Sequence, residues 1–260
     1  ITEGSVREGS ERGSVEFRDV CFRYPGASEE DLSHISFQVK QGETLAIIGA
    51  TGSGKSTLVS LIPRFYDATS GQVLVDGVDV KDYAFDALYD KLGYVTQKAV
   101  LFSGSIRDNI FFGESAADAD DGALSSAIEL SQAKEFVDKL PEGTEHHIAQ
   151  LGRNVSGGQK QRLSIARALA RRPEILVFDD SFSALDYRTD AKLREGLAKQ
   201  LHDITKIIVA QRISTIRHAD KIIVLDRGEA VGMGTHEELM QNCEVYREIA
   251  TSQLSAAELA

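Results

Sequence analysis

Cysteines and long apolar runs are scarce in this sequence of 260 residues, and acidic residues outnumber basic ones. The two cysteines, Cys21 and Cys243, are too few for a disulfide framework and too far apart for a zinc site, which fits a reducing cytosol. The net charge of −11 argues against binding to the phosphate backbone of nucleic acids. No apolar run approaches the roughly 20 residues that span a bilayer, and no signal peptide opens the chain.

The remaining composition is ordinary for a soluble globular domain. With 42% hydrophobic and 27% charged residues, the chain can bury one substantial core, so we expect one domain over residues 14–260. Residues 1–13, ITEGSVREGSERG, are polar and have no apolar period, so they are predicted to be a linker. Because the sequence starts at Ile1 and not at methionine, we expect it to be a fragment of a longer protein.

Apolar periodicity predicts a β-rich start, a helical middle and an alternating end. Strands are expected at SVEFRDVCFRY, HISFQV, ETLAIIG, QVLVDG and GYVTQ, with a bulge near Arg18 and Asp19 where the alternation changes phase. Residues 104–172 are almost wholly helical in pattern. Strands EILVFD, TKIIVA and KIIVLD then alternate with helices, the last from about His236. The sequence therefore predicts an α/β fold with an N-terminal antiparallel β subdomain, a parallel core and an inserted α-helical subdomain.

The segment GATGSGKST, residues 49–57, matches the P-loop pattern between a strand and a helix. Its glycines allow backbone N–H groups to curl around phosphate, Lys55 reaches the β and γ oxygens, and Ser56 ligates Mg²⁺. The core is therefore predicted to be that of a RecA-like P-loop NTPase that binds ATP and Mg²⁺. The expected nucleotide-binding residues are Gly49, Thr51, Gly52, Ser53, Gly54, Lys55, Ser56 and Thr57.

The strand EILVFD delivers two carboxylates, Asp179 and Asp180, to its C-terminal edge. Such a pair is typical of a metal ligand followed by a general base. We expect Asp179 to hold Mg²⁺ through water, from a strand beside the P-loop strand. An N-cap for the following helix is the alternative interpretation of Asp179.

The stretch NVSGGQKQR, residues 154–162, opens another helix with a serine and two glycines. The free N–H groups and dipole of such a helix start favour an anion, but the P-loop already accounts for one phosphate group. A second nucleotide is therefore needed. The stretch resembles the signature of ABC-type ATPases, in which the SGGQ helix of one subunit caps the ATP held by another. This resemblance places Ser156, Gly157, Gly158 and Gln159 against a partner's nucleotide; a glycine-rich cap without a ligand is the alternative.

The resemblance covers nearly the whole chain and implies roles for three more residues. Tyr24 in FRYPG stands where the family's A-loop aromatic stacks on adenine, and Gln97 in YVTQ matches the glutamine that reaches Mg²⁺ and the attacking water. Asp186, which ends SALD, matches the D-loop that runs along the partner subunit. From the residues alone, Tyr24 fits a core or edge tyrosine and Gln97 a surface residue.

Two further segments, FSGSIRDNIFFG and VLDRGEAVGMGTHEEL, look like those of the ATP-binding domains of ABC exporters. In such exporters the membrane-spanning part precedes the ATPase in one chain. The resemblance therefore implies a transmembrane domain of the same chain, missing here, to which residues 1–13 would be the linker. It also implies a position at the cytoplasmic face of the cell membrane.

The sequence departs from the family at two positions. The family has a catalytic glutamate after the Walker B aspartate and a switch histidine in VAHR, whereas this chain has Asp180 and, in VAQR, Gln211. A base must come within about 2.6–3.2 Å of the proton it takes, and aspartate is shorter than glutamate by one C–C bond, about 1.5 Å. Gln211 can donate a hydrogen bond to the γ-phosphate but cannot carry the charge available to histidine.

Intact binding groups with altered hydrolytic groups resemble the degenerate half of a heterodimeric ABC exporter. In that arrangement the partner is a second, non-identical ABC ATP-binding domain. The SGGQ segment of this chain would serve the partner's complete site, and its own P-loop would form the slow one, with Asp180, Gln211 and Gln97 as its catalytic residues. A homodimer with two weak sites and a non-hydrolysing nucleotide-gated clamp are the alternatives.

Overall fold

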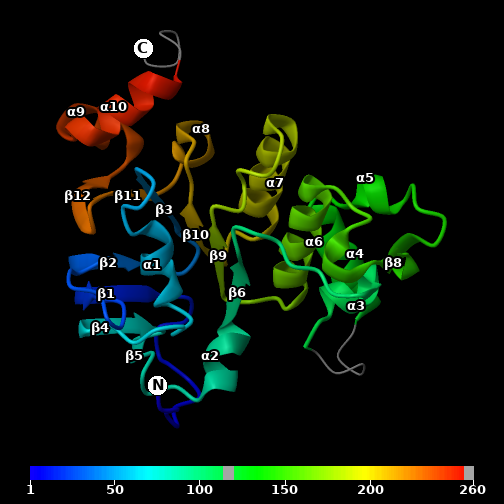
Figure 1. The fold of residues 1–260 in the computed structure, drawn as a ribbon, viewed down its shortest axis with the longest axis horizontal. Coiled ribbons are helices and arrows are strands. Elements are labelled where there is room, and N and C mark those ends of the chain that lie inside the picture. The colour runs from blue at the N-terminus through cyan, green and yellow to red at the C-terminus, as the bar shows by residue number, and fades with distance from the viewer. Residues whose placement is uncertain (114–119, 255–260) are drawn as a thin grey trace.

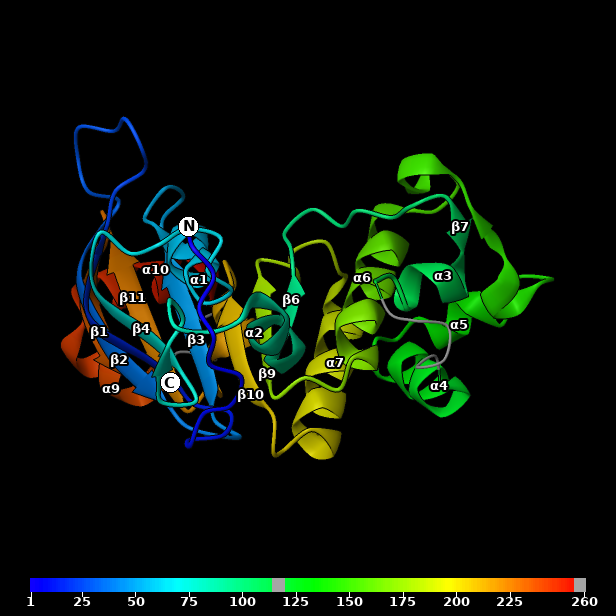
Figure 2. The ribbon, with the colours of Figure 1, turned by 90° about the horizontal axis from the view of Figure 1, so that it is seen from below.

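A computed structural model describes residues 1–113 and 120–254 of the chain. Residues 114–119 of the predicted helical subdomain lie outside the described residues. So do residues 255–260 at the predicted C-terminal end of the domain. A β-rich lobe and a helical lobe lie next to each other, and strand β6 runs near their junction (Figures 1 and 2).

The central sheet is mostly parallel. Its six strands lie in the order β12 (Glu229–Gly234), β11 (Lys221–Asp226), β3 (Thr44–Gly49), β10 (Thr205–Val209), β9 (Ile175–Asp179) and β6 (Leu92–Val95). Only β12 is antiparallel to its neighbour. Along β3, Ala46 and Ile48 join one buried apolar cluster whereas Leu45 and Ile47 join another. The apolar runs form strands here because both faces of the sheet are buried, and the predicted parallel core is confirmed.

A second sheet confirms the predicted antiparallel subdomain. Its strands lie in the order β2 (Leu32–Val39), β1 (Val15–Phe22), β4 (Ser70–Val75) and β5 (Val78–Asp79). The pairing of β1 with β2 shifts register between Phe17 and Val20, and Asp19 has a left-handed φ of 50°. The extra residue lets apolar side chains on both sides of the shift face the core, as the phase change in the sequence predicted.

The helical lobe confirms the predicted insertion. It consists of α3 (Ile106–Ile110), α4 (Asp121–Leu130), α5 (Lys134–Val137) and α6 (Gly157–Ala170), with 3₁₀ turns at Gly143–Glu145 and Gln150–Gly152. It is less helical than predicted, because β7 (Gly104–Ser105) pairs with β8 (His147–Ile148). The helical pattern predicted over residues 104–172 is also interrupted at Gln132, whose φ of 60° lets the Ala133 N–H reach the Ile128 carbonyl oxygen at 2.9 Å.

The strand of Asp179 does not lie beside the P-loop strand, and that expectation is wrong. Strand β10 lies between β3 and β9 and pairs with both. Every residue of β10 is buried, so its backbone groups need partners on both edges. Helix α7 (Tyr187–Gln200) makes the crossover from β9 to β10. Asp179 therefore reaches the P-loop across the end of an intervening strand.

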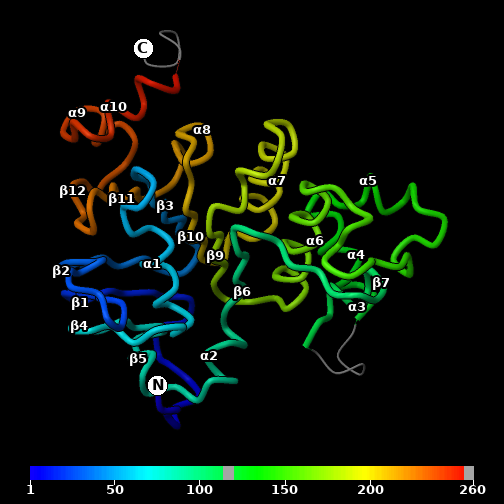
Figure 3. Tube along the Cα trace, viewed as in Figure 1, coloured from blue at the N-terminus to red at the C-terminus, as the bar shows by residue number. Residues whose placement is uncertain are grey.

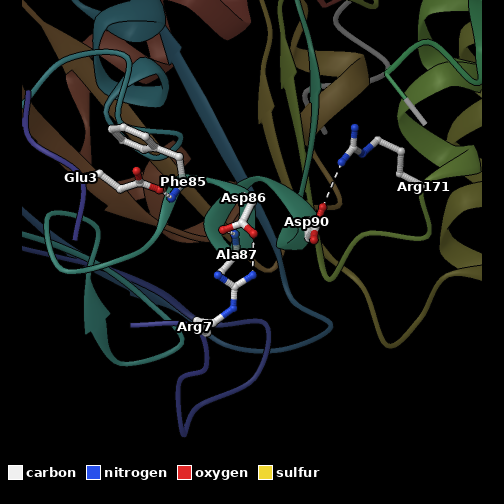
Figure 4. Close-up of polar contacts among 7 residues, drawn as sticks. All are labelled: Glu3, Arg7, Phe85, Asp86, Ala87, Asp90 and Arg171. Atoms are coloured by element: carbon white, nitrogen blue, oxygen red, sulfur yellow. Dashed lines mark hydrogen bonds and ion pairs between the residues drawn. The ribbon is translucent and has the colours of Figure 1, made fainter. Parts of the chain in front are cut away.

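Residues 1–13 are attached to the domain along much of their length. Gly4 N–H donates to the Tyr83 carbonyl oxygen at 3.0 Å, and the Glu3 carboxylate accepts from Phe85 N–H at 2.9 Å, at the start of α2 (Phe85–Lys91). Arg7 pairs with Asp86 on the same helix (Figure 4). A side chain at Gly4 would meet the Asp82 carbonyl oxygen at 2.1 Å, so this attachment requires glycine. That the segment is a linker stays a prediction.

Helix α2 also contacts the C-terminal end of α6, because Asp90 pairs with Arg171 at 3.2 Å (Figure 4). Helix α8 (Ile213–Ile216) precedes β11, and α9 (His236–Asn242) and α10 (Glu244–Gln253) follow β12 at the end of the described residues (Figure 3). Helix α9 begins at His236, as predicted, behind a capping box of Thr235 and Glu238. Among the described residues, no helix has the length and apolar character needed to cross a membrane.

Candidate functional site

The P-loop runs from the end of β3 to the start of α1 (Lys55–Ser60), as predicted. A Cβ at Gly49 would lie 2.1 Å from the Leu225 carbonyl oxygen on β11. Gly54 has φ 100° and stands directly before α1. Both positions require glycine, the first for a close backbone approach and the second for its left-handed conformation. The loop is thereby held in a curled conformation, of the kind in which backbone N–H groups bind phosphate.

The ammonium of Lys55 lies within the curl of the P-loop. It donates to the carbonyl oxygens of Gly49 at 2.9 Å and Ala50 at 2.7 Å. Burial lowers the pKa of Lys55, and the nearby carboxylates of Asp180 and Asp179 oppose that shift. The loop thus carries a half-buried positive charge that donates to neutral oxygens, two carbonyls and, at 3.4 Å, the Ser53 hydroxyl. An anionic phosphate can replace these acceptors.

Ser56 and Asp179 bring two oxygen donors together at the end of the P-loop. The Ser56 hydroxyl donates to Oδ1 of Asp179 at 2.7 Å, and the Tyr94 hydroxyl donates to Oδ2 at 3.4 Å. Burial raises the pKa of Asp179, against these two hydrogen bonds and the charge of Lys55, which lower it. Tyr94 was not predicted as a site residue from the sequence. Its position three residues before Gln97 in GYVTQ was the available signal.

Asp180, Gln97 and Gln211 meet at one oxygen atom. Gln97 Nε2 donates to Oδ2 of Asp180 at 3.0 Å, and Gln211 Nε2 donates to the same oxygen at 2.6 Å. Asp180 is 6% exposed, whereas both glutamines are exposed residues whose amides reach down to it. The three residues predicted to be catalytic therefore form one hydrogen-bonded group, from three separate segments of the chain.

The backbone of Asp180 is held in an uncommon conformation. Its φ is 49°, and its N–H donates to the Val209 carbonyl oxygen at 3.1 Å while its carbonyl accepts from the Ser183 hydroxyl at 2.8 Å. Aspartate tolerates this left-handed region better than most residues with a Cβ. The direction of the Asp180 side chain is thus fixed by a backbone contact with β10 and by the hydroxyl of Ser183, three residues further along the chain.

Tyr24 lies beside the first turn of α1, next to Thr57. Its hydroxyl and that of Thr57 are 3.1 Å apart, and its ring meets those of Phe22 and Tyr66 edge-on, at centroid distances of 4.8 and 5.1 Å. The ring is half-buried, so part of it faces solvent. This position next to the P-loop is compatible with stacking on a base.

The SGGQ residues and Asp186 are not brought to the P-loop. Helix α6, which they open, belongs to the helical lobe, whereas α1 lies in the β-rich lobe, and both views agree on this separation (Figures 1 and 2). Ser156 caps α6 reciprocally with Gln159, and a Cβ at Gly157 would meet nothing within 4 Å. Asp186 caps α7 by accepting from Thr189 N–H at 2.9 Å. The open start of α6 has room for a group from another molecule.

The site offers hard oxygen donors for a metal. In the described part of the chain, no group of three or more His, Cys, Asp or Glu side chains could hold a metal ion. A hydroxyl and a carboxylate at 2.7 Å separation instead match the few protein ligands that Mg²⁺ takes when phosphate and water complete its shell. Oxygen donors of this kind do not favour zinc or copper.

Comparison with known proteins agrees with this geometry. Residues 32–183 match the family model described as ABC transporter, which is more than half of the chain. The chain belongs to the ABC transporter family. It is 46% identical over 257 residues to the uncharacterized ABC transporter ATP-binding protein YfiB of Bacillus subtilis, covering 97% of this chain and 44% of that protein. It is 43% identical to the putative multidrug export ATP-binding/permease protein YgaD of the same organism, covering 96% and 43%.

The predicted α/β fold is confirmed by comparison with a solved structure. The structure of a bacterial Atm1-family ABC exporter with ATP bound superposes with a TM-score of 0.89 at 35% identity, covering 96% of this chain and 43% of that chain. The chain thus spans less than half the length of these relatives. It is an ABC nucleotide-binding domain homologous to exporter ATP-binding proteins, as the sequence predicted. The degenerate character of its site stays a prediction.

Proposed function

We propose that this domain binds Mg·ATP at its own P-loop, closes on a second ABC ATP-binding domain, and hydrolyses the ATP of its own P-loop slowly. The observation that carries the proposal is the Asp180 group. Two amides donate to Oδ2 and hold the Asp180 carboxylate in one position, so that proton transfer from water depends on how far the other oxygen, Oδ1, reaches. The shorter aspartate side chain also reaches less far than the glutamate of the family pattern.

Mg²⁺ would be held by Ser56 directly and by Asp179 through water, with Gln97 nearby. The Ser56 hydroxyl and the Asp179 carboxylate face one another, and Gln97 contacts the neighbouring Asp180. When bound, the ion neutralises charge on the phosphates. Lys55 contributes the positive charge on the other side, by exchanging its backbone carbonyl partners for phosphate oxygens.

The partner would complete each site with its signature helix. Support comes from the separation of this chain's SGGQ helix from its own P-loop (Figure 2) and from the open surface at Gly157. The relative named as a putative multidrug export ATP-binding/permease protein supports a transmembrane domain in the same protein and a place at the cytoplasmic face of the cell membrane. A non-identical partner would bring the glutamate and histidine that this chain lacks.

Slow turnover by the chain alone tests this function. The described chain contains the groups that bind nucleotide but lacks a partner's SGGQ helix, and without a tether two copies meet at low effective concentration. We therefore expect saturable Mg·ATP binding with hydrolysis near background in a monomeric preparation. Single-turnover hydrolysis, measured with and without a partner domain, also separates slow hydrolysis from a clamp that never hydrolyses. Fast steady-state hydrolysis by strict monomers would contradict the proposal.

Tyr24→Ala is expected to weaken ATP binding by about 1–2 kcal/mol, the scale of stacking between a base and an aromatic ring. Tyr24→Phe keeps the ring and loses only the hydroxyl that meets Thr57 at 3.1 Å, so it should retain most of the affinity. Equilibrium titrations with ATP and with inorganic triphosphate distinguish the base from the phosphates. An equal loss for both ligands in Tyr24→Ala would show that the ring does not stack on the base.

A further inference from the structure

The last turn of α10 touches the loop that carries Gln211. Gln253 Oε1 accepts from Ile213 N–H at 2.9 Å, and Gln253 Nε2 donates to the Gln211 carbonyl oxygen at 2.7 Å. One carboxamide therefore binds two backbone groups two residues apart. Residues 42 positions apart in sequence meet here, so no local pattern indicated the contact.

These two bonds satisfy backbone groups that the loop itself leaves open. Ile213 is the first residue of α8, and the N-cap residue Arg212 makes no side-chain cap hydrogen bond. The first N–H groups of a helix have no partner within it. Gln253 supplies an acceptor for one of them and at the same time donates to the carbonyl of Gln211. The loop is thus fixed on both sides of Arg212 by a side chain from another helix.

Helix α10 is a firm support for this contact. Tyr246 and Ala250 are fully buried, and the Tyr246 hydroxyl lies 2.7 Å from Nδ1 of buried His236 on α9. Ile213 and Ile216 of α8 belong to the same apolar cluster as these α10 residues. A side chain on a packed helix holds its partner more accurately than one on a free loop.

A cavity makes the contact more important for the loop. A space of about 460 Å³ is lined by Gly49, Ala50, Thr51, Gln211, Glu248 and Gln253, among others. It separates the P-loop from α10, so close packing does not support the Gln211 loop on that side. Gln253 and Gln211 both line this space, and the two hydrogen bonds of the Gln253 carboxamide connect α10 to the Gln211 loop beside it.

We propose that Gln253 is a positioning residue for Gln211 and, through it, for Asp180. Holding the backbone of Gln211 keeps its Nε2 at 2.6 Å from Asp180 Oδ2. A displaced loop would move the amide that donates to Asp180. The inference rests on the proposed function, because it gives Gln211 a part in hydrolysis. It adds α10, which contributes no residue to the P-loop or the Walker B strand, to the site.

The test compares Gln253→Ala, Gln211→Ala and the double variant in the full-length protein with its partner. Single-turnover hydrolysis is measured with the partner's own site inactivated. Gln253→Ala should slow hydrolysis about threefold to tenfold, the range for lost hydrogen bonds, with ATP affinity unchanged. In the Gln211→Ala background it should cause no further loss, because residues that act through one another are not additive. Equal slowing in both backgrounds would overturn the proposal.

Amide hydrogen exchange gives a second readout that does not depend on hydrolysis. Exchange at Ile213 N–H should be faster in Gln253→Ala and remain slow in Gln253→Glu, which keeps the acceptor but loses the donor to Gln211. Ser252→Ala is the matched control, since Ser252 lines the same cavity but donates only within its helix, to Ile249. If Gln211→Ala leaves the rate unchanged, the proposed role of Gln211 fails. If exchange at Ile213 is unchanged in Gln253→Ala, the positioning role of Gln253 fails.

Discussion

Replacing Lys55 with alanine is expected to lower the affinity for Mg·ATP about 10-fold to 100-fold. A hydrogen bond to a charged group contributes about 1.5–3 kcal/mol, and about 1.4 kcal/mol corresponds to a factor of ten. The ammonium already lies within the P-loop, 2.9 Å from the Gly49 carbonyl oxygen and 2.7 Å from that of Ala50. It therefore needs little rearrangement to bind phosphate. Calorimetric titration with Mg·ATP measures the change.

A matched control separates this local effect from the general loss of a positive charge. Lys199→Ala removes an exposed ammonium that pairs with Glu195 on α7, far in sequence from the P-loop. Because an exposed pair of this kind contributes little, its removal should leave affinity and stability nearly unchanged. If Lys199→Ala weakened ATP binding as much as Lys55→Ala, the role of Lys55 in the P-loop would be wrong.

The parts of the fold that were predictable from sequence have strong local signals. Apolar runs gave the buried parallel strands, alternation with a change of phase gave β1 and its bulge at Asp19, and the P-loop pattern needed only its flanking strand and helix. The proximity of Ser56 and Asp179 was also predictable, because the carboxyl ends of parallel strands meet at one edge of a sheet.

The order of the strands and the long-range contacts had no such signal. The insertion of β10 between β3 and β9 is decided by sheet pairing, which leaves no pattern within either strand. Two of these contacts each depend on a single side chain and join distant segments. Glu3 contacts the start of α2, and Gln253 contacts the Gln211 loop. Polar residues in such places look like surface residues in the sequence, because their partners are backbone groups.

The candidate site was predicted residue by residue, but the mutual contact of three of its residues was not. Asp180 and Gln211 stood out as departures from a family pattern, and Gln97 as a match to one. Their convergence on one oxygen required the positions of β6, β9 and β10 to be known. This convergence gives the two departures a common explanation, because a glutamine at 211 can satisfy a short aspartate at 180 without carrying charge.

Restoring the family pattern with Asp180→Glu and Gln211→His together is expected to raise hydrolysis at this chain's own site more than either change alone. The glutamate extends the carboxylate toward water, and the histidine replaces the amide that donates to Oδ2 at 2.6 Å. General-base catalysis is typically worth about 10²–10⁴-fold. Because both side chains act on one arrangement, their effects should couple instead of adding.

The single variants are expected to gain little, and for different reasons. Asp180→Glu alone would place a longer carboxylate against Gln97 and Gln211, whose amides are set for the aspartate at 3.0 and 2.6 Å. It would also put glutamate at a φ of 49°, which aspartate tolerates better. Gln211→His alone would supply a group that can carry charge but would leave the base short.

The assay is single-turnover hydrolysis in the assembled protein, with the partner's complete site silenced by removing its glutamate. If the double variant binds ATP but hydrolyses it no faster than the parent, then Asp180 and Gln211 do not limit hydrolysis at this site. The SGGQ helix that the partner contributes to the site would then be the element that limits it.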